Sequence, residues 1–364
     1  IKSVLLIKLS EMGATICAAP ALKLINESAE DEVYVLVFKR NAPAFELLDF
    51  PAERICTIRV TSFFAFVGDT FSALFWLRRR NIQAVVDFEL FSCFSALLAY
   101  ASGATRRVGF HDTSGEGMYR GSVFNRKVRY DPQQHISANY LNLANALCEK
   151  EPPPVYHQVA STVGELDIKP LVVRDADWSI IKDILLDVLP HYDADNHKLL
   201  LVNANASELL PQRMWPAERY KALVVKMLAS CDDLFVLFTG TANERTYLQQ
   251  IVKDINELRC AEIAGRLNLR QLITLFANSK ALVTNDSGPA HFASLTKMPT
   301  LVLFGPETPN LYRPLGENIH VIYANVECSP CVSAARAKVC DCENNECMKS
   351  ISVDEVFQSL KELF

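Results

Sequence analysis

The sequence predicts an α/β protein made of two doubly wound, Rossmann-like domains in tandem. Continuous runs of β-branched and aliphatic residues alternate with longer segments of helical periodicity, a pattern typical of parallel strands buried on both faces and joined by crossover helices. The chain has 364 residues, more than one core usually holds, and 50% of them are hydrophobic. These observations favour two domains, each with its own parallel sheet.

The predicted strands are short apolar runs that end in polar turns. In the first half they are Ser3–Leu9, Val33–Phe38, Ile55–Val60, Ala84–Phe88 and Arg107–Phe110. In the second half they are Leu199–Asn203, Leu234–Thr239, Ala281–Thr284 and Thr300–Phe304. Helices are expected to fill the gaps, and a last helix is expected over Val353–Leu363.

The domain boundary is expected between residues 151 and 169, where the run Pro152–Pro154 cannot continue a helix. We therefore predict domains 1–160 and 161–364. Because ligands of open α/β sheets bind outside the carboxyl ends of the strands, the two domains are expected to place two different substrates across a central cleft.

Charge and hydropathy narrow the function classes. The net charge is −5, and the first 150 residues carry 17 Lys and Arg against 15 Asp and Glu. Nucleic acid is therefore a poor partner, whereas a local anionic ligand remains open. No apolar run reaches the length that spans a bilayer, and the N-terminus lacks the pattern of a signal peptide, so we expect a cytoplasmic protein. The oligomeric state is not predicted.

The segment Ala281–Pro306 is a buried strand that runs into a polar turn, a helix and a second buried strand. Asn285 and Asp286 end the strand, and Ser287 and Gly288 would let backbone N–H groups approach an anion closely at the start of the helix. This layout favours a phosphate site. An ordinary capped turn between a strand and a helix is the alternative.

Three separated segments resemble glycosyltransferase family 9, the bacterial ADP-heptose lipopolysaccharide heptosyltransferases. They are SVLLIKLSEMGATICAAPAL from Ser3, LLVNANASELLPQRMWP from Leu200, and NDSGPAHFASLTKMPTLVLFGPETP from Asn285. The resemblance implies a GT-B fold and inverting transfer of a sugar, heptose from an ADP-sugar donor, to a lipopolysaccharide-core, lipid-linked or other cell-envelope saccharide acceptor. It implies no catalytic metal. A nucleotide-sugar epimerase of the same fold is an alternative.

By this resemblance, the donor contacts fall on Ser207, Arg213, Glu244, Asp286, Ser287 and Gly288, with Gly13 in the turn after the first strand. Arg213 stands where a lysine is usual. Its guanidinium can hold two phosphate oxygens and stabilise a leaving diphosphate without a metal ion. A solvated cation for Arg213 and a plain first-turn carboxylate for Glu244 remain the alternatives.

The sequence departs from the family after Gly13, where Ala14 replaces the aspartate thought to deprotonate the acceptor. Either another group is the base, or the acceptor differs, or the chain binds sugars without transferring them. Glu11 is the nearest substitute, and His111 at the end of a predicted strand is a second candidate. Further candidates with the same kind of position are Asp87, Glu89 and Glu116.

Five of the eleven cysteines crowd between Cys328 and Cys347. The spacing predicts a closed structural zinc or iron site made by Cys328, Cys331, Cys342 and Cys347, with Cys340 as a spare or a substitute ligand. Reduced free thiols are the alternative.

The apolar segment Thr61–Leu77 precedes three arginines. It is expected to pack on the first sheet, and peripheral contact with the inner membrane is the alternative.

Overall fold

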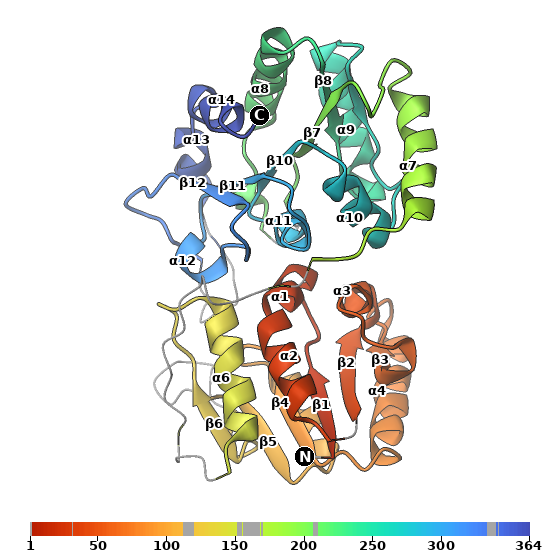
Figure 1. Ribbon diagram of the computed structural model, residues 1–364. Coiled ribbons are helices and arrows are strands. Elements are labelled where there is room, and N and C mark those ends of the chain that lie inside the picture. Colours follow the sequence, from red (N-terminus) through yellow and green to blue (C-terminus); the bar gives the residue numbers. More distant parts are fainter. Residues whose placement is uncertain are drawn as a thin grey trace. The chain divides into compact units, whose positions relative to one another are not determined.

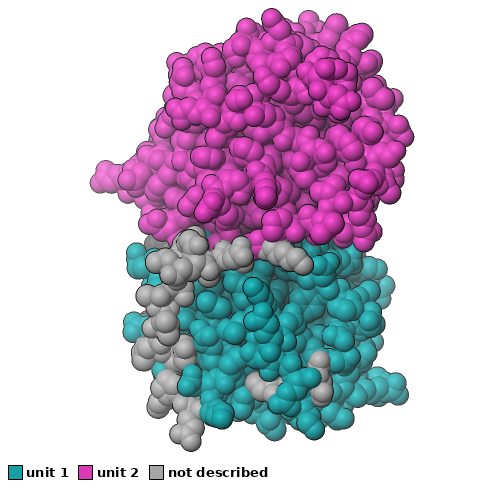
Figure 2. All heavy atoms as spheres, viewed as in Figure 1, with its two compact units in different colours: residues 1–167 teal, residues 168–364 magenta. Residues whose placement is uncertain are grey.

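The computed structural model describes residues 2–30, 32–111, 120–150, 155, 168, 170–206, 210–332, 340 and 342–364. The chain splits into two compact units, unit 1 from residue 1 to 167 and unit 2 from residue 168 to 364, which Figure 2 shows in teal and magenta. The predicted boundary after residue 160 and the Pro152–Pro154 run both lie outside the described residues.

Unit 1 contains a six-stranded parallel sheet in the order β3-β2-β1-β4-β5-β6 (Figure 1). Its strands are β1 (Ser3–Ile7), β2 (Glu32–Phe38), β3 (Ile55–Ile58), β4 (Ala84–Asp87), β5 (Arg106–His111) and β6 (Arg126–Arg129). The central strand β1 is fully buried. The order reverses between β1 and β4, which is where open sheets of this kind bind ligands.

The helices of unit 1 cover the sheet on both faces. They are α1 (Met12–Cys17), α2 (Ala19–Ser28), α3 (Ala42–Leu47), α4 (Phe63–Arg78), α5 (Cys93–Ala101) and α6 (Ile136–Cys148), with 3-10 turns at Lys39–Asn41 and Ala52–Arg54. Helices α2 and α6 lie side by side in front of the sheet in Figure 1. The buried apolar residues of α4 and α5 pack with β1, β2 and β4 in one core cluster.

Unit 2 repeats this plan with a parallel sheet in the order β12-β11-β10-β7-β8-β9. Its strands are β7 (Lys198–Asn203), β8 (Leu234–Phe238), β9 (Cys260–Glu262), β10 (Ala281–Asn285), β11 (Thr300–Phe304) and β12 (Ile319–Tyr323). Its helices are α7 (Asp175–Val188), α8 (Ala217–Ser230), α9 (Arg245–Ile255), α10 (Leu269–Ala277), α11 (Gly288–Ala293), α12 (Pro309–Tyr312), α13 (Glu346–Ser350) and α14 (Val353–Lys361), with 3-10 turns at Pro211–Arg213 and Ala242–Glu244. The predicted fold class is thereby confirmed.

The prediction missed three edge strands, β6, β9 and β12. An edge strand has a neighbour on one side only, so it needs no continuous apolar run. The sequence of β6 is RKVR, β9 has three residues, and a histidine interrupts the apolar residues of β12. Pairing with β5, β8 and β11 makes these segments strands, which is a tertiary effect.

Candidate functional site

The turn after β10 is tied to the segment that carries Arg213. Asn285 is fully buried at the end of β10. Its Oδ1 accepts hydrogen bonds from the backbone N of Trp215 at 3.0 Å and the hydroxyl of Tyr220 at 2.9 Å, and its Nδ2 donates to the carbonyl of Asn205 at 3.0 Å. One amide side chain thus joins three segments at the carboxyl edge of the sheet.

Arg213 lies between two buried carboxylates. Its Nε is 3.3 Å from Oδ2 of Asp286, and its Nη2 is 2.9 Å from Oε1 of Glu307. Nη1 also donates to the carbonyl of Asp286 at 3.4 Å. The side chain of Arg213 is 18% exposed, against 3% for Asp286 and 2% for Glu307. The structure therefore brings together the predicted residues Arg213 and Asp286, and adds Glu307.

Ser287 and Gly288 stand beside this ion-pair cluster. Both are partly exposed, whereas Asp286 is buried. Gly288 opens α11, and a Cβ at this position would come within 3.4 Å of the Phe292 ring. The turn is therefore accessible at Ser287 and Gly288. Ser207, also predicted to contact the donor, lies outside the described residues.

Glu244 follows β8 and closes a capping box. Its Oε2 accepts a hydrogen bond from the backbone N of Thr241 at 2.6 Å, while the Thr241 side chain caps the turn in return. This is the local role that the alternative interpretation of Glu244 describes. Gly240 precedes the box, and a Cβ there would lie 2.8 Å from Nδ2 of Asn205 and 2.9 Å from Oε2 of Glu244. A side chain at this position would require Asn205 and Glu244 to shift.

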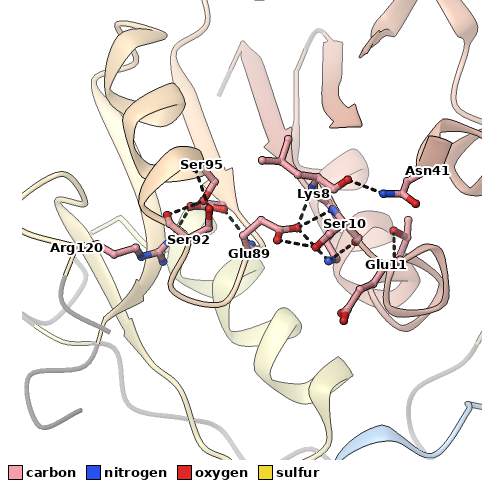
Figure 3. Close-up of polar contacts among 11 residues, drawn as sticks. Lys8, Ser10, Glu11, Asn41, Glu89, Ser92, Ser95 and Arg120 are labelled. Atoms are coloured by element: carbon pink, nitrogen blue, oxygen red, sulfur yellow. Dashed lines mark hydrogen bonds and ion pairs between the residues drawn. The ribbon is translucent and has the colours of Figure 1, made fainter. Parts of the chain in front are cut away.

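At the carboxyl edge of the unit 1 sheet, Glu89 holds the turn that follows β1 (Figure 3). Its Oε1 accepts from the backbone N of Leu9 at 2.8 Å and of Ser10 at 3.1 Å, and Oε2 accepts from the Ser10 hydroxyl at 2.9 Å. Nζ of Lys8 lies 3.1 Å from Oε1 and donates to the carbonyl of Ser10 at 2.7 Å. Both carboxylate oxygens are engaged, so Glu89 positions this turn.

Asp87 is the second engaged carboxylate of this edge. Its Oδ1 accepts from the backbone N of Glu89 at 2.9 Å, and its Oδ2 accepts from the Ser95 hydroxyl at 2.7 Å and from Nη1 of Arg120 at 2.6 Å. Burial raises the pKa of Asp87 to about 6, in spite of the Arg120 guanidinium that favours the ionised form. Figure 3 shows Arg120 directed at this cluster.

Glu11 is exposed, next to the turn that Glu89 holds, and has left-handed backbone angles, φ 63° and ψ 87°. A side chain with a Cβ is strained there, and such strain concentrates at functional sites. The predicted Gly13 and the departure from the family, Ala14, are buried in the first turns of α1. His111 ends β5 and is buried. Glu116 lies outside the described residues.

The cysteine segment, residues 328–347, contacts the loop after β11 and the turn that carries Gln212 and Arg213. The backbone N of Cys331 donates to the carbonyl of Pro306 at 3.0 Å, and Nε2 of Gln212 donates to the carbonyl of Cys340 at 3.3 Å. The Sγ atoms of Cys331 and Cys340 are 3.3 Å apart. Burial, followed by the hydrogen bond with Cys340, raises the pKa of Cys331 to about 12.

No group of three or more His, Cys, Asp or Glu side chains among the described residues is arranged to hold a metal ion. The thiol of Cys331 contacts that of Cys340, the cysteine expected to be a spare or a substitute ligand. Cys347 and Cys342 also lie near enough to raise the pKa of Cys331. The zinc or iron site stays a prediction.

Sequence reasoning did not assign a role to Glu307 or Lys8. A signal existed for Glu307, because it follows β11 as Asp286 follows β10, at the same edge of adjacent strands. A buried lysine one residue after β1 likewise requires a carboxylate nearby. The partner, however, is 81 residues away in sequence.

Two parallel six-stranded sheets, each with polar residues at the carboxyl ends of its strands, are the two Rossmann-like units of a GT-B fold. The family model of glycosyltransferase family 9 (heptosyltransferase) matches residues 77–340, and the chain belongs to this family.

Individual relatives agree with this assignment. The lipooligosaccharide heptosyltransferase 2 of Campylobacter jejuni subsp. jejuni is 27% identical over 356 residues, which is 97% of this chain and 95% of the relative. The structure of E. coli ADP-heptose lps heptosyltransferase II has a TM-score of 0.73 at 20% identity and covers 100% of this chain and 98% of that one. E. coli heptosyltransferase WaaC with ADP has a TM-score of 0.66 at 18% identity, with both chains covered at 100%. These likenesses confirm the GT-B fold.

Proposed function

We propose that this chain transfers heptose from ADP-heptose to a saccharide of the lipopolysaccharide core, with inversion at the anomeric carbon. Family membership supports the reaction class. The names of the relatives support the acceptor, and WaaC structures with ADP and with ADP-2-deoxy-2-fluoro heptose support the donor. The single observation that carries the proposal is the contact of Arg213 with the Asp286 turn, 73 residues away in sequence.

Arg213 serves the donor in this proposal. Its planar guanidinium has five N–H groups in a fixed geometry, so one side chain can contact carboxylates and a phosphate together. Asp286 and Glu307 orient it. As the bond from the sugar to the diphosphate breaks, negative charge grows on the leaving oxygen, and an oriented cation stabilises that charge. Ser287 and Gly288, partly exposed beside it, supply further polar contacts.

Glu11 is the proposed base for the acceptor hydroxyl. Glu11 is exposed at the carboxyl edge of the sheet, where solvent and an acceptor can reach it, whereas Asp87 and Glu89 are buried. His111, at the end of β5, is the second candidate. A base here would remove the proton while the oxygen attacks the anomeric carbon.

The test is acceptor-dependent release of ADP. Purified chain is incubated with ADP-heptose and a lipopolysaccharide-core saccharide, and ADP and the glycosylated product are measured. The proposal expects both to rise together and to depend on both substrates. A thermal shift with ADP-heptose but no product would support the sugar-binding alternative. A changed sugar nucleotide without acceptor would support the epimerase.

The base is assigned with two conservative variants, Glu11→Gln and His111→Gln, and with Glu27→Gln of α2 as an exposed control. Loss of the base is expected to lower kcat by about 100-fold or more with little change in donor KM. The control should keep full activity. If neither variant loses kcat, the base lies elsewhere and this assignment is wrong.

We also propose that the reaction takes place in the cytoplasm.

We propose further that zinc or iron at the cysteine segment, if bound, is structural. Metal analysis of the purified chain tests whether an ion is bound. Cys331→Ser should remove any bound metal, and Cys93→Ser, an exposed cysteine of α5, should not. If the purified chain contains no metal and keeps full activity, the cysteines are free thiols and the structural metal is excluded.

A further inference from the structure

Helix α4 exposes a row of aromatic rings. Phe63, Phe64, Phe71 and Phe75 are 74%, 86%, 70% and 60% exposed. On the opposite side of this 16-residue helix, Ala73 and Leu77 are buried in the core cluster of unit 1. The expectation that this segment packs on the sheet thus holds for one side only. Large exposed apolar patches mark binding surfaces.

Helix α5 extends the same outer layer. The rings of Phe66 and Phe94 are 5.0 Å apart, and Nε of Arg78 donates to the carbonyl of Ala101 at 3.1 Å. The two helices therefore run side by side in the same direction. Leu97 and Tyr100 of α5 are 63% and 65% exposed. We call the exposed set Phe63, Phe64, Phe71, Phe75, Leu97 and Tyr100 the α4–α5 face.

The charges around the α4–α5 face are positive. Arg78, Arg79 and Arg80 end α4, and no carboxylate forms an ion pair with them in the part of the chain that the structure describes. The guanidinium of Arg79 lies 4.3 Å from the centroid of Phe75. Asp69 is the one acidic residue in the sequences of α4 and α5, and Arg59 matches its charge at 2.8 Å.

We propose that the α4–α5 face binds the surface of a membrane rich in anionic lipids. Phenylalanine and tyrosine rings with arginines at their border suit the boundary between headgroups and acyl chains, where the rings enter and the cations meet phosphate groups. A second copy of the chain fits less well, because a symmetric contact would bring the arginines of both copies together. No helix among the described residues is long and apolar enough to cross a bilayer.

The position of α4 relative to the sheet connects membrane binding with the proposed acceptor site. α4 begins five residues after β3 ends, so Phe63 and Phe64 lie near the carboxyl ends of the strands, the edge that also carries Lys8, Glu11 and Glu89. A membrane held at this face would present a lipid-linked saccharide to that edge. This link rests on the proposed function, whereas the binding itself does not.

The experiment is flotation of the full chain with two kinds of vesicle. One contains phosphatidylcholine alone, and the other contains about 30% phosphatidylglycerol. The chain should float with the anionic vesicles and at least about tenfold less with the neutral ones, and about 0.5 M salt should weaken the binding. Equal flotation with both kinds, or none with either, would overturn the proposal.

Two sets of variants locate the surface. Phe64→Ser with Phe71→Ser removes rings, and Arg78→Gln with Arg79→Gln removes charge. Each pair should lower the bound fraction about tenfold. The thermal unfolding midpoint should change little, since these side chains are exposed and the arginine pair loses one surface hydrogen bond, from Arg78 to Ala101. Val225→Ser with Leu258→Ser, exposed apolar residues of unit 2, is the matched control and should bind normally.

Failure of the membrane proposal can be told from failure of the proposed function. ADP release with a soluble acceptor should be the same in all of these variants. If the wild-type chain releases no ADP, this result counts against the proposed function alone. Light scattering that shows a dimer abolished by the Phe64 and Phe71 changes, with no vesicle binding, would assign the α4–α5 face to a second copy and overturn the membrane proposal. A control pair that loses binding as strongly would overturn it as well.

Discussion

A cation pairs with carboxylates in two turns, the turn around Arg213 in unit 2 and the turn around Lys8 in unit 1. The two turns differ in the number of carboxylates and in the exposure of the cation. Lys8 is 4% exposed and faces one carboxylate, Glu89, which also accepts three hydrogen bonds from Leu9 and Ser10. Arg213 is 18% exposed and faces two carboxylates. The first cluster is neutral and enclosed, as a scaffold requires. The Arg213 cluster is the more exposed of the two, so a ligand can reach its cation more easily than it can reach Lys8.

The largest effect is expected at Arg213 and tests whether the two turns differ in function. Arg213→Gln should lower kcat/KM by about 100- to 1000-fold, because an oriented cation at the leaving group is lost. It should also lower the free energy of unfolding by about 3–5 kcal/mol, because two buried carboxylates lose the guanidinium that pairs with them.

Adding Glu307→Gln to Arg213→Gln separates these two effects. The double variant should recover much of the stability, since one of the buried charges is removed, and should stay inactive. Kinetics and urea unfolding measure the two quantities. Recovery of activity together with stability would show that Arg213 is a scaffold residue like Lys8, and the comparison would fail.

The scaffold role in unit 1 is tested at Glu89. Glu89→Gln leaves Lys8 buried without a carboxylate and should lower the free energy of unfolding by about 3 kcal/mol. Lys8→Met in the same chain should restore part of it. Asp69→Asn, which breaks a more exposed pair with Arg59, is the control and should cost much less. If Glu89→Gln and Asp69→Asn lower the free energy of unfolding by similar amounts, Glu89 is not a scaffold residue.

The pH dependence of stability sharpens the comparison at Asp87. Its pKa is raised to about 6 in the folded chain, so between roughly pH 4 and 6 the folded state binds more protons than the unfolded state. The contribution of Asp87 to stability is therefore full below this window and is lost as the pH rises through it. Urea unfolding of wild type and Asp87→Asn at several pH values should show the wild-type advantage shrinking from pH 4 to 6. A constant difference would contradict the assignment.

The smallest effect on the free energy of unfolding is expected from the backbone strain at Glu11. A glycine there relieves the left-handed backbone, so Glu11→Gly should be up to about 1 kcal/mol more stable than Glu11→Ala, although both lack the carboxylate. Thermal or urea unfolding compares the two. Equal stability would mean that the turn held by Glu89 relaxes without cost, and that the φ of 63° is not enforced by the scaffold.

Much of the fold was predictable, and the misses have one cause. Buried central strands such as β1 and β10 appear as apolar runs, whereas the edge strands β6, β9 and β12 become strands by pairing with a neighbour. The site shows the same division. Asp286 was found by its motif, while Glu89 was only one of several carboxylates at strand ends until its four donors were known.

The sequence by itself determined the fold class and the family, because periodicity and motifs are properties of neighbouring residues. The tertiary structure alone decided which charges meet. Arg213 and Glu307 are 94 residues apart, and Lys8 and Glu89 are 81 apart. Their contacts follow from the order of parallel strands, which brings the carboxyl ends of distant segments to one edge of a sheet.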